Sequence, residues 1–265
     1  MTCWIYDLDG VVTSLTEKRI TNPRLYGYFV QQLEKEESVT INTGRGLSFI
    51  REQVLTPLLN HIQKQGISES LLHNFFAVGE KGNAWIEDEK DCFDMTTAIP
   101  QDFAQKVQTV VERDFSDTMF FDTTKKTMIS LEMHTGLAIE KFMNVREELI
   151  QTLESLLQES GLEKEYAIDP TLTAADIQHK TAGKAKGTER ILAWMEKRDT
   201  HPDEFVAFGD SAADIETGEA LQKQEKQFTF VFVGDPKLIR TQPSFPITFT
   251  KEGHDKGVVE YLQEN

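Results

Sequence analysis

The sequence is poor in cysteine and in basic residues. Its two cysteines, Cys3 and Cys92, lie far apart and follow no metal-ligand spacing, which excludes a disulfide framework and a zinc-finger pattern. Its 265 residues include 28 Lys and Arg against 44 Asp and Glu, so the net charge is −16. Nucleic-acid backbones and acidic lipids would repel such a chain, so we expect neither nucleic acid nor membrane among its partners. Small anionic substrates are not excluded, because a bound cation reverses the local sign of charge.

Long hydrophobic runs are also missing. The longest fall far short of the roughly 20 apolar residues that a membrane-spanning helix needs. The first ten residues, MTCWIYDLDG, show no basic region followed by an apolar stretch, so they do not resemble a secretion signal. Together with the low cysteine content, these absences favour a protein of the reducing cytoplasm. Nothing in the chain indicates an oligomeric state.

The order of the expected elements predicts an α/β core interrupted by an insertion. Up to residue 83, short apolar strands alternate with amphipathic helices, and the same alternation returns after Gly183. Between these parts, two expected helices accompany several neighbouring strands, which is typical of a separate α+β unit. The predicted fold is a doubly wound, Rossmann-like parallel sheet formed by residues 1–83 and 180–265, with an inserted α+β cap domain at 84–179.

Some expected elements bear directly on the site or on the domain boundaries. In the core we expect a helix over 47–65, kinked at Pro57, and a helix over 188–198. In the insertion we expect a hairpin at 84–95, helices at 101–115 and 145–160, and strands at 127–133, 164–168 and 172–177.

Three expected core strands end in polar residues. The first ends in the motif Asp7-Leu8-Asp9-Gly10, the second in Asn42-Thr43-Gly44-Arg45, and the first strand after the insertion in Gly209-Asp210-Ser211-Ala212-Ala213-Asp214. In a doubly wound sheet, ligands bind beyond the carboxyl ends of the strands, where the winding reverses. We therefore expect these three segments, and the lysine-containing stretch 184–187, to meet in one crevice.

Such a crevice suits phosphoryl transfer. Asp7, Asp9 and Asp210 supply the hard oxygen ligands that Mg²⁺ prefers, and a carboxylate can attack phosphorus to form an aspartyl-phosphate. The transferred group needs positive charge and hydrogen-bond donors, which the Thr43 hydroxyl, the following N–H groups and a lysine can supply. Asp9, two residues beyond Asp7, can reach the leaving oxygen as a general acid and later activate water.

Each motif alone also has an ordinary structural explanation. DxDG is typical of an acidic turn, and the residues after Gly10 lack the ligand pattern of a calcium-binding EF-hand loop. TGR alone is more often a strand-to-helix turn, and GDSxxD can simply cap a helix. Lys184 and Lys186 are by default solvated, although a helix N-terminus disfavours cations. The common order of these motifs, each at a strand end or helix start, favours one joint site.

The order DxDG, TGR, Lys-Gly before a helix and GDSxxD resembles the haloacid dehalogenase superfamily of phosphatases with an aspartate nucleophile. The place of the insertion, between TGR and the lysine, is similar to the branch that contains Cof-like, sucrose-phosphate and trehalose-phosphate phosphatases. The resemblance covers the whole chain in layout, although the insertion matches only in size and α/β character. It implies a Mg²⁺-dependent phosphatase that hydrolyses a small phosphorylated metabolite, with a sugar phosphate as the substrate class.

The resemblance implies roles for the aspartates. Asp7 would be the nucleophile and a metal ligand, and Asp9 the general acid/base, which binds the metal through its backbone carbonyl. Asp210 would ligate Mg²⁺, and Asp214 would support the metal shell. The sequence departs from the family pattern at Ala213, where the branch usually carries Asn, and this puts one contact around the metal in doubt.

The resemblance also implies a phosphate-binding set. Thr43 and Gly44 would bind the phosphate. Lys186 is the preferred lysine, because Lys-Gly followed by a periodic helix fits the family pattern best, and Lys184 is the alternative. Residues 79–82 occupy the place where this branch has an Asn-Gly turn, and they would form a hinge into the insertion rather than a substrate contact.

Two other functions are compatible with this layout. A phosphomannomutase-like sugar phosphomutase returns the phosphoryl group to the sugar, and a non-catalytic phospho-ligand sensor keeps only the fold. The joint presence of Asp7, Asp9, Asp210 and a lysine argues against the sensor, because a binding protein needs neither a nucleophile nor an acid. We expect the insertion to act as a lid that excludes water, and its sequence does not identify the sugar.

Overall fold

The computed structural model describes residues 1–171, 173–239 and 242–265. The chain divides into two compact units, one formed by Met1–Cys92 and Gly183–Asn265 and the other by Phe93–Ala182. The boundary differs from the one expected at residue 84. The strands β4 (Ala84–Glu87) and β5 (Lys90–Phe93) extend the sheet of the first unit, because β4 pairs with that sheet in antiparallel fashion. The hairpin therefore belongs to the core.

The first unit is built on a largely parallel sheet with the strand order β12-β11-β10-β1-β2-β3-β4-β5. Its other strands are β1 (Thr2–Tyr6), β2 (Ser38–Asn42), β3 (Phe75–Gly79), β10 (Glu204–Gly209), β11 (Phe228–Phe232) and β12 (Ile247–Phe249). β1 pairs in parallel with β2 on one side and with β10 on the other. The winding thus reverses at β1, and a ligand crevice is expected beyond its carboxyl end.

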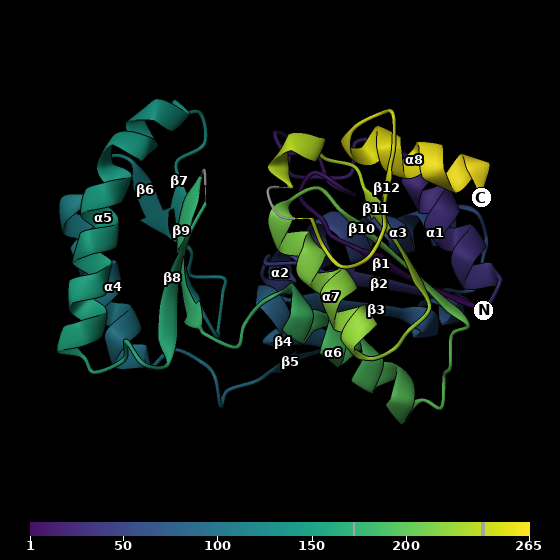
Figure 1. Ribbon diagram of the computed structural model, residues 1–265, viewed down its shortest axis with the longest axis horizontal. Helices are drawn as coiled ribbons and strands as arrows, with labels where there is room; N and C mark the ends of the chain where they lie inside the picture. The colour runs from purple at the N-terminus through teal and green to yellow at the C-terminus, as the bar shows by residue number, and fades with distance from the viewer. Residues whose placement is uncertain (172, 240–241) are drawn as a thin grey trace. The chain divides into compact units, whose positions relative to one another are not determined.

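Helices cover both faces of this sheet (Figure 1). They are α1 (Arg24–Glu34), α2 (Leu47–Ile50), α3 (Thr56–Lys64), α6 (Lys184–Lys197), α7 (Ile215–Lys223) and α8 (His254–Glu264), with short turns η2 (Glu69–Asn74), η3 (Glu80–Gly82), η4 (Ala212–Asp214) and η5 (Pro236–Leu238). Because successive side chains of a strand point to opposite faces, neighbouring residues of β1 pack against different helices. Ile5 joins a hydrophobic cluster with Ile191 and Trp194 of α6, whereas the ring of Tyr6 lies 5.1 Å from that of Phe29 in α1.

The segment expected as one kinked helix over 47–65 contains a π-helical turn, η1 (Arg51–Leu55), between α2 and α3. Pro57 lies at the start of α3 and has no N–H to donate to the preceding turn. The wider π-helical turn lies where that bond is missing, so the proline marks a change of helix type.

The second unit is an α+β sandwich. Its antiparallel sheet has the order β6-β7-β9-β8, and α4 (Gln101–Asp114) and α5 (Ile139–Glu159) cover one face of it (Figure 1). The strands are β6 (Met119–Phe121), β7 (Ile129–Met133), β8 (Tyr166–Pro170) and β9 (Ala174–His179). The strand expected at 172–177 corresponds to β9, and Leu172 lies outside the described residues. Helix α5 begins at Ile139, earlier than the expected residue 145.

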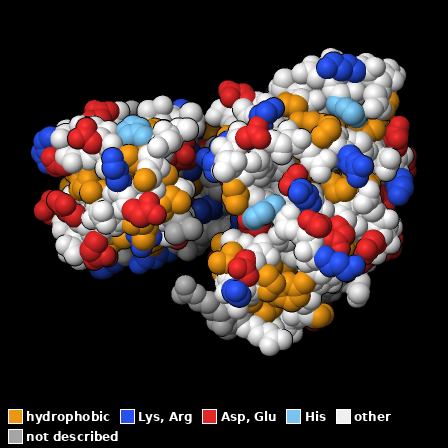
Figure 2. Space-filling view, turned by 90° about the horizontal axis from the view of Figure 1, so that it is seen from above, with side chains coloured by type: hydrophobic (Ala, Val, Ile, Leu, Met, Phe, Trp, Pro, Cys, Tyr) orange, Lys and Arg blue, Asp and Glu red, His pale blue; other side chains and the backbone are white. Residues whose placement is uncertain are grey.

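Within the described ranges, no helix combines the length and hydropathy needed to cross a bilayer. On the face shown in Figure 2, acidic and basic side chains are interspersed on both units. The net negative charge of the chain is therefore not gathered into a single patch on that face.

Candidate active site

Asp7 directly follows β1 and lies beside Lys184, the first residue of α6. The Lys184 Nζ is 2.5 Å from Asp7 Oδ1 and 2.7 Å from Asp214 Oδ1, and it donates a hydrogen bond of 2.8 Å to the Asn42 carbonyl. The Asp7 and Lys184 side chains are only 12% and 11% exposed. One ammonium group therefore joins the carboxyl ends of β1 and β2 to the turn that follows β10.

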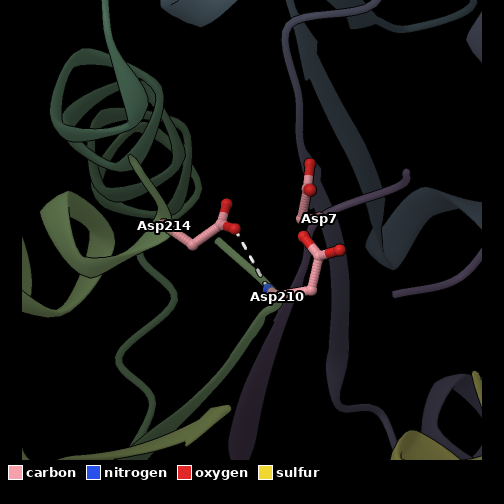
Figure 3. A group of neighbouring side chains, drawn as sticks. All are labelled: Asp7, Asp210 and Asp214. Atoms are coloured by element: carbon pink, nitrogen blue, oxygen red, sulfur yellow. Dashed lines mark hydrogen bonds between the residues drawn. The ribbon is translucent and has the colours of Figure 1, made fainter. Parts of the chain in front are cut away.

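Three carboxylates gather at this point. Asp7, Asp210 and Asp214 each offer an oxygen, and these oxygens lie within 4.8 Å of one another (Figure 3). Asp214 Oδ2 accepts hydrogen bonds from the Asp210 N–H at 3.1 Å and from the Ser211 N–H and hydroxyl at 3.0 and 2.8 Å. Asp214 is thus held by the turn after β10 and by Lys184, which suits a supporting residue better than a direct metal ligand.

The cluster carries more negative charge than Lys184 offsets. Burial raises the pKa of Asp7 to about 8, although the Lys184 ammonium acts in the opposite direction. Burial and the charge of Asp214 raise the pKa of Asp210 to about 7. Burial alone would lower the pKa of Lys184, but Asp214 and Asp7 raise it overall. A proton or a cation at the carboxylates is therefore favoured, and closely spaced hard oxygens fit Mg²⁺.

Asp9 lies among cations. Arg45 Nε donates to Asp9 Oδ2 at 2.7 Å, Arg45 Nη2 donates to Oδ1 at 3.1 Å, and Lys18 Nζ lies 3.4 Å from the same carboxylate. Burial would raise the pKa of Asp9, but the hydrogen bonds and charge of Arg45, together with Lys18, lower it overall. In this arrangement Asp9 is ionised and suited to accept a proton. Neither cation is among the site residues expected from the sequence; Arg45 stands in the TGR motif, whereas no pattern marks Lys18.

Thr43 and Gly44 form the turn after β2. The Thr43 hydroxyl accepts a hydrogen bond of 3.2 Å from the Arg45 N–H, and the Thr43 carbonyl accepts one of 3.1 Å from the Lys81 N–H. A Cβ at Gly44 would lie 3.5 Å from the Lys81 side chain. Lys81, which the sequence placed only in a hinge, therefore brings a further cation to the expected phosphate-binding turn.

The two candidate lysines have different partners. Lys184 Nζ contacts Asp7, whereas Lys186 Nζ donates to Asn83 Oδ1 at 2.5 Å. Side chains two residues apart on an α-helix point about 200° away from each other, so Lys184 and Lys186 cannot face the same group. Helix α6 begins at Lys184 rather than at the expected Thr188, which places both lysines in its first turn. The geometry therefore favours Lys184 over Lys186, the lysine preferred from the sequence.

Asn42 and Gly187 hold the start of α6 against β2. Asn42 Nδ2 donates to the Lys184 carbonyl at 2.9 Å. A Cβ at Gly187 would collide with the Asn42 amide, so glycine permits this close approach. The Lys-Gly pair seen in the sequence is thus explained by the packing of Gly187, while Lys184 supplies the charge.

The sequence matches no protein-family model and no curated protein. Its fold is similar to that of the C-terminal domain of trehalose-6-phosphate phosphatase from C. albicans, with a TM-score of 0.69, 12% identity, and coverage of 99% of this chain and 91% of that one. A trehalose-6-phosphate phosphatase related protein gives a TM-score of 0.65, 12% identity and coverage of 99% and 96%. The sucrose-phosphatase of Synechocystis sp., solved with sucrose and phosphate, gives a TM-score of 0.57 and 14% identity, with coverage of 99% of this chain and 96% of that one. The predicted fold, a doubly wound α/β core with an inserted α+β unit, is confirmed.

Proposed function

We propose that this protein is a Mg²⁺-dependent phosphatase that hydrolyses a small phosphorylated metabolite, a sugar phosphate, through an aspartyl-phosphate on Asp7. The observation that carries the proposal is the buried contact between Asp7 and Lys184 where the winding of the sheet reverses, with Asp210 and Asp214 beside it. The substrate class is supported by the similarity of the fold to phosphatases named for trehalose 6-phosphate and sucrose.

In the first half-reaction, an Asp7 carboxylate oxygen attacks the phosphorus. The new O–P bond forms as the P–O bond to the leaving group breaks, and the leaving oxygen takes a proton from Asp9. Lys184 places a positive charge beside the attacking carboxylate, and the turn at Thr43 and Gly44 would donate hydrogen bonds to the phosphoryl oxygens. We propose Lys184, rather than Lys186, as the phosphate-binding lysine.

In the second half-reaction, water hydrolyses the aspartyl-phosphate. Asp9 takes a proton from the water as its oxygen attacks phosphorus, the bond to Asp7 breaks, and inorganic phosphate leaves. The hydrogen bond from Arg45, which lowers the pKa of Asp9, suits Asp9 to this role as a base. To act as the acid in the first half-reaction, Asp9 must carry a proton and separate from Arg45.

The Asp7 and Asp210 carboxylates and the Asp9 backbone carbonyl would hold Mg²⁺, with Asp214 as support. The raised pKa values of Asp7 and Asp210 support this assignment, because they indicate a site in need of positive charge. When bound, the metal neutralises repulsion between these carboxylates and the incoming phosphate.

The proposal is tested by assaying phosphate release from a panel of sugar phosphates and p-nitrophenyl phosphate, with Mg²⁺ or with EDTA. Wild type and the surface control Asp199→Asn should release phosphate only with Mg²⁺, and Asp7→Asn should release none. Release that survives in Asp7→Asn would exclude the covalent mechanism. Transfer to a second sugar position without net release would indicate a mutase, and metal-independent binding without release would indicate a sensor.

A further inference from the structure

His254, the first residue of α8, reaches the candidate metal site from the far end of the chain. Its Nδ1 lies 2.8 Å from the Gly10 carbonyl oxygen and 3.7 Å from Asp210 Oδ2. A carbonyl oxygen only accepts hydrogen bonds, so Nδ1 must carry a proton and donate to Gly10. The imidazole thus binds the loop that contains Asp7 and Asp9, while the same nitrogen lies near the Asp210 carboxylate.

The backbone holds His254 in this place. Its φ of +58° lies in the left-handed region, which is uncommon for a residue other than glycine. The His254 N–H donates to the Val233 carbonyl at 2.7 Å, and the Val233 N–H donates to the Gly209 carbonyl at 2.9 Å. These bonds join the start of α8 to the end of β10, one residue before Asp210.

Gly10, Asp210 and His254 are packed closely together. Gly10 has a φ of +78°, and a Cβ added there would collide with the Asp210 carboxylate and lie 3.2 Å from His254 Nδ1. Gly10 directly follows Asp9, whose carbonyl is a proposed metal ligand. One imidazole therefore lies against Asp210, a proposed ligand that directly follows β10, and against the peptide next to the Asp9 carbonyl, a second proposed ligand.

We propose that His254 is a positioning residue of the metal site. Its Nδ1–H fixes the Gly10 carbonyl, and with it the adjacent Asp9 carbonyl, and its ring restricts the Asp210 side chain. The inference rests on the proposed function, because it takes Asp210 and the Asp9 carbonyl as Mg²⁺ ligands. His254 acts on Mg²⁺ affinity and takes no part in the bond-breaking steps.

Three substitutions separate this role from a general structural one. Asparagine places its amide nitrogen near the position of Nδ1 and tolerates the left-handed backbone, whereas glutamine places its amide near the position of Nε2. We expect His254→Ala and His254→Gln to weaken Mg²⁺ binding by about 10- to 100-fold, the usual range for residues that orient metal ligands, and His254→Asn to stay within about threefold of wild type. The rate of phosphate release at saturating Mg²⁺ should change little in all three.

Mg²⁺ binding is measured by calorimetry on the full chain without substrate, and thermal unfolding without metal checks that each variant is folded. The exposed residue His201 provides the control His201→Ala, which should bind Mg²⁺ as wild type does. Equal affinity in wild type and His254→Ala, or an equal loss in the Asn and Gln variants, overturns the inference and leaves the proposed function standing. A wild type that neither binds Mg²⁺ nor releases phosphate overturns the proposed function and, with it, this inference.

Discussion

Lys184 is the residue on which the candidate site depends most closely. Its ammonium contacts carboxylates from two separate segments and the carbonyl of a third, so it fixes Asp7 relative to Asp214. Removing one partner of a buried charge pair leaves the other uncompensated, which is costly. The lysine therefore holds the site together, and in the proposed mechanism it also supplies the charge that phosphoryl transfer requires.

The first prediction concerns the two lysines. Lys184→Met keeps much of the side-chain volume and removes the charge, and we expect it to lower the rate of phosphate release by about 100- to 1000-fold, as loss of a transition-state donor usually does. Lys186→Met is the matched control and should retain activity within a few-fold. Steady-state kinetics at saturating Mg²⁺ measure both variants. A loss of activity in Lys186→Met alone would contradict this and identify Lys186 as the phosphate-binding lysine.

The second prediction concerns pH and metal. Burial raises the pKa of Asp7 from 3.8 to about 8 and that of Asp210 from 3.8 to about 7. Between pH 3.8 and these raised values, the folded metal-free protein therefore binds more protons than the unfolded chain. Its free energy of unfolding therefore falls as pH rises through this range. Mg²⁺ can replace the protons, so it should raise the melting temperature more at about pH 8 than at about pH 5. Calorimetry checks this, and Asp210→Asn should lose most of the difference. An equal increase at both pH values in wild type would contradict the prediction.

At this scale, motif order was enough to select the acidic residues but not their partners. Asp7 belongs to the DxDG motif and Asp210 and Asp214 to the GDSxxD motif, and the structure brings all three together. The choice between Lys184 and Lys186 depended on the helix start, which hydrophobic periodicity placed four residues too late because the first turn of α6 contains few apolar side chains. The contact of Arg45 with Asp9 joins residues 36 positions apart, and no local pattern encodes it.

Among the elements, buried strands were the most predictable and short or context-dependent ones the least. β2 (Ser38–Asn42) ends at Asn42, where the expected motif begins, and a β-branched run buried on both faces has a strong local signal. β6 (Met119–Phe121) is not among the expected strands, since three residues are too few to show an alternation. The π-helical turn before Pro57 results from a missing hydrogen bond that hydrophobic periodicity does not report.

The third prediction compares two helical glycines. Nothing lies within 4 Å of a Cβ added at Gly27 in α1, so Gly27→Ala should stabilise the protein by about 0.5–1 kcal/mol through helix propensity. A Cβ at Gly218 in α7 would collide with the ring of Phe245, so Gly218→Ala should destabilise it by about 1–3 kcal/mol. Urea unfolding measures both free energies. Stabilisation by both substitutions would show that α7 and Phe245 are not packed as described.

At the scale of the whole molecule, each unit has a hydrophobic core of its own. One cluster joins β1, β3, β10 and β11 to α6 and α7, and a separate cluster joins the strands of the second unit to α4 and α5. The change in the order of elements along the sequence indicated two units. That order could not assign the hairpin at 84–95 to one of the two units. The hairpin belongs to the first unit because β4 pairs with β3, and composition does not encode this pairing.

The fourth prediction follows from these separate cores. A fragment of residues 93–182 should fold alone, because its sheet, helices and buried cluster are complete within it. Circular dichroism and a cooperative urea transition would show this, and Leu153→Asp, which places a charge in that cluster, should abolish the transition. A fragment with no cooperative transition would show that the second unit depends on the first.

The central claim is that Asp7 forms a covalent bond to phosphorus. Its most direct test is to mix the protein with Mg²⁺ and a hydrolysed sugar phosphate, quench with borohydride, which reduces an aspartyl-phosphate to homoserine, and analyse the peptides by mass spectrometry. We predict homoserine in place of Asp7, dependent on both substrate and metal. Rapid phosphate release with Asp7 unmodified, or homoserine at another aspartate, would contradict the mechanism.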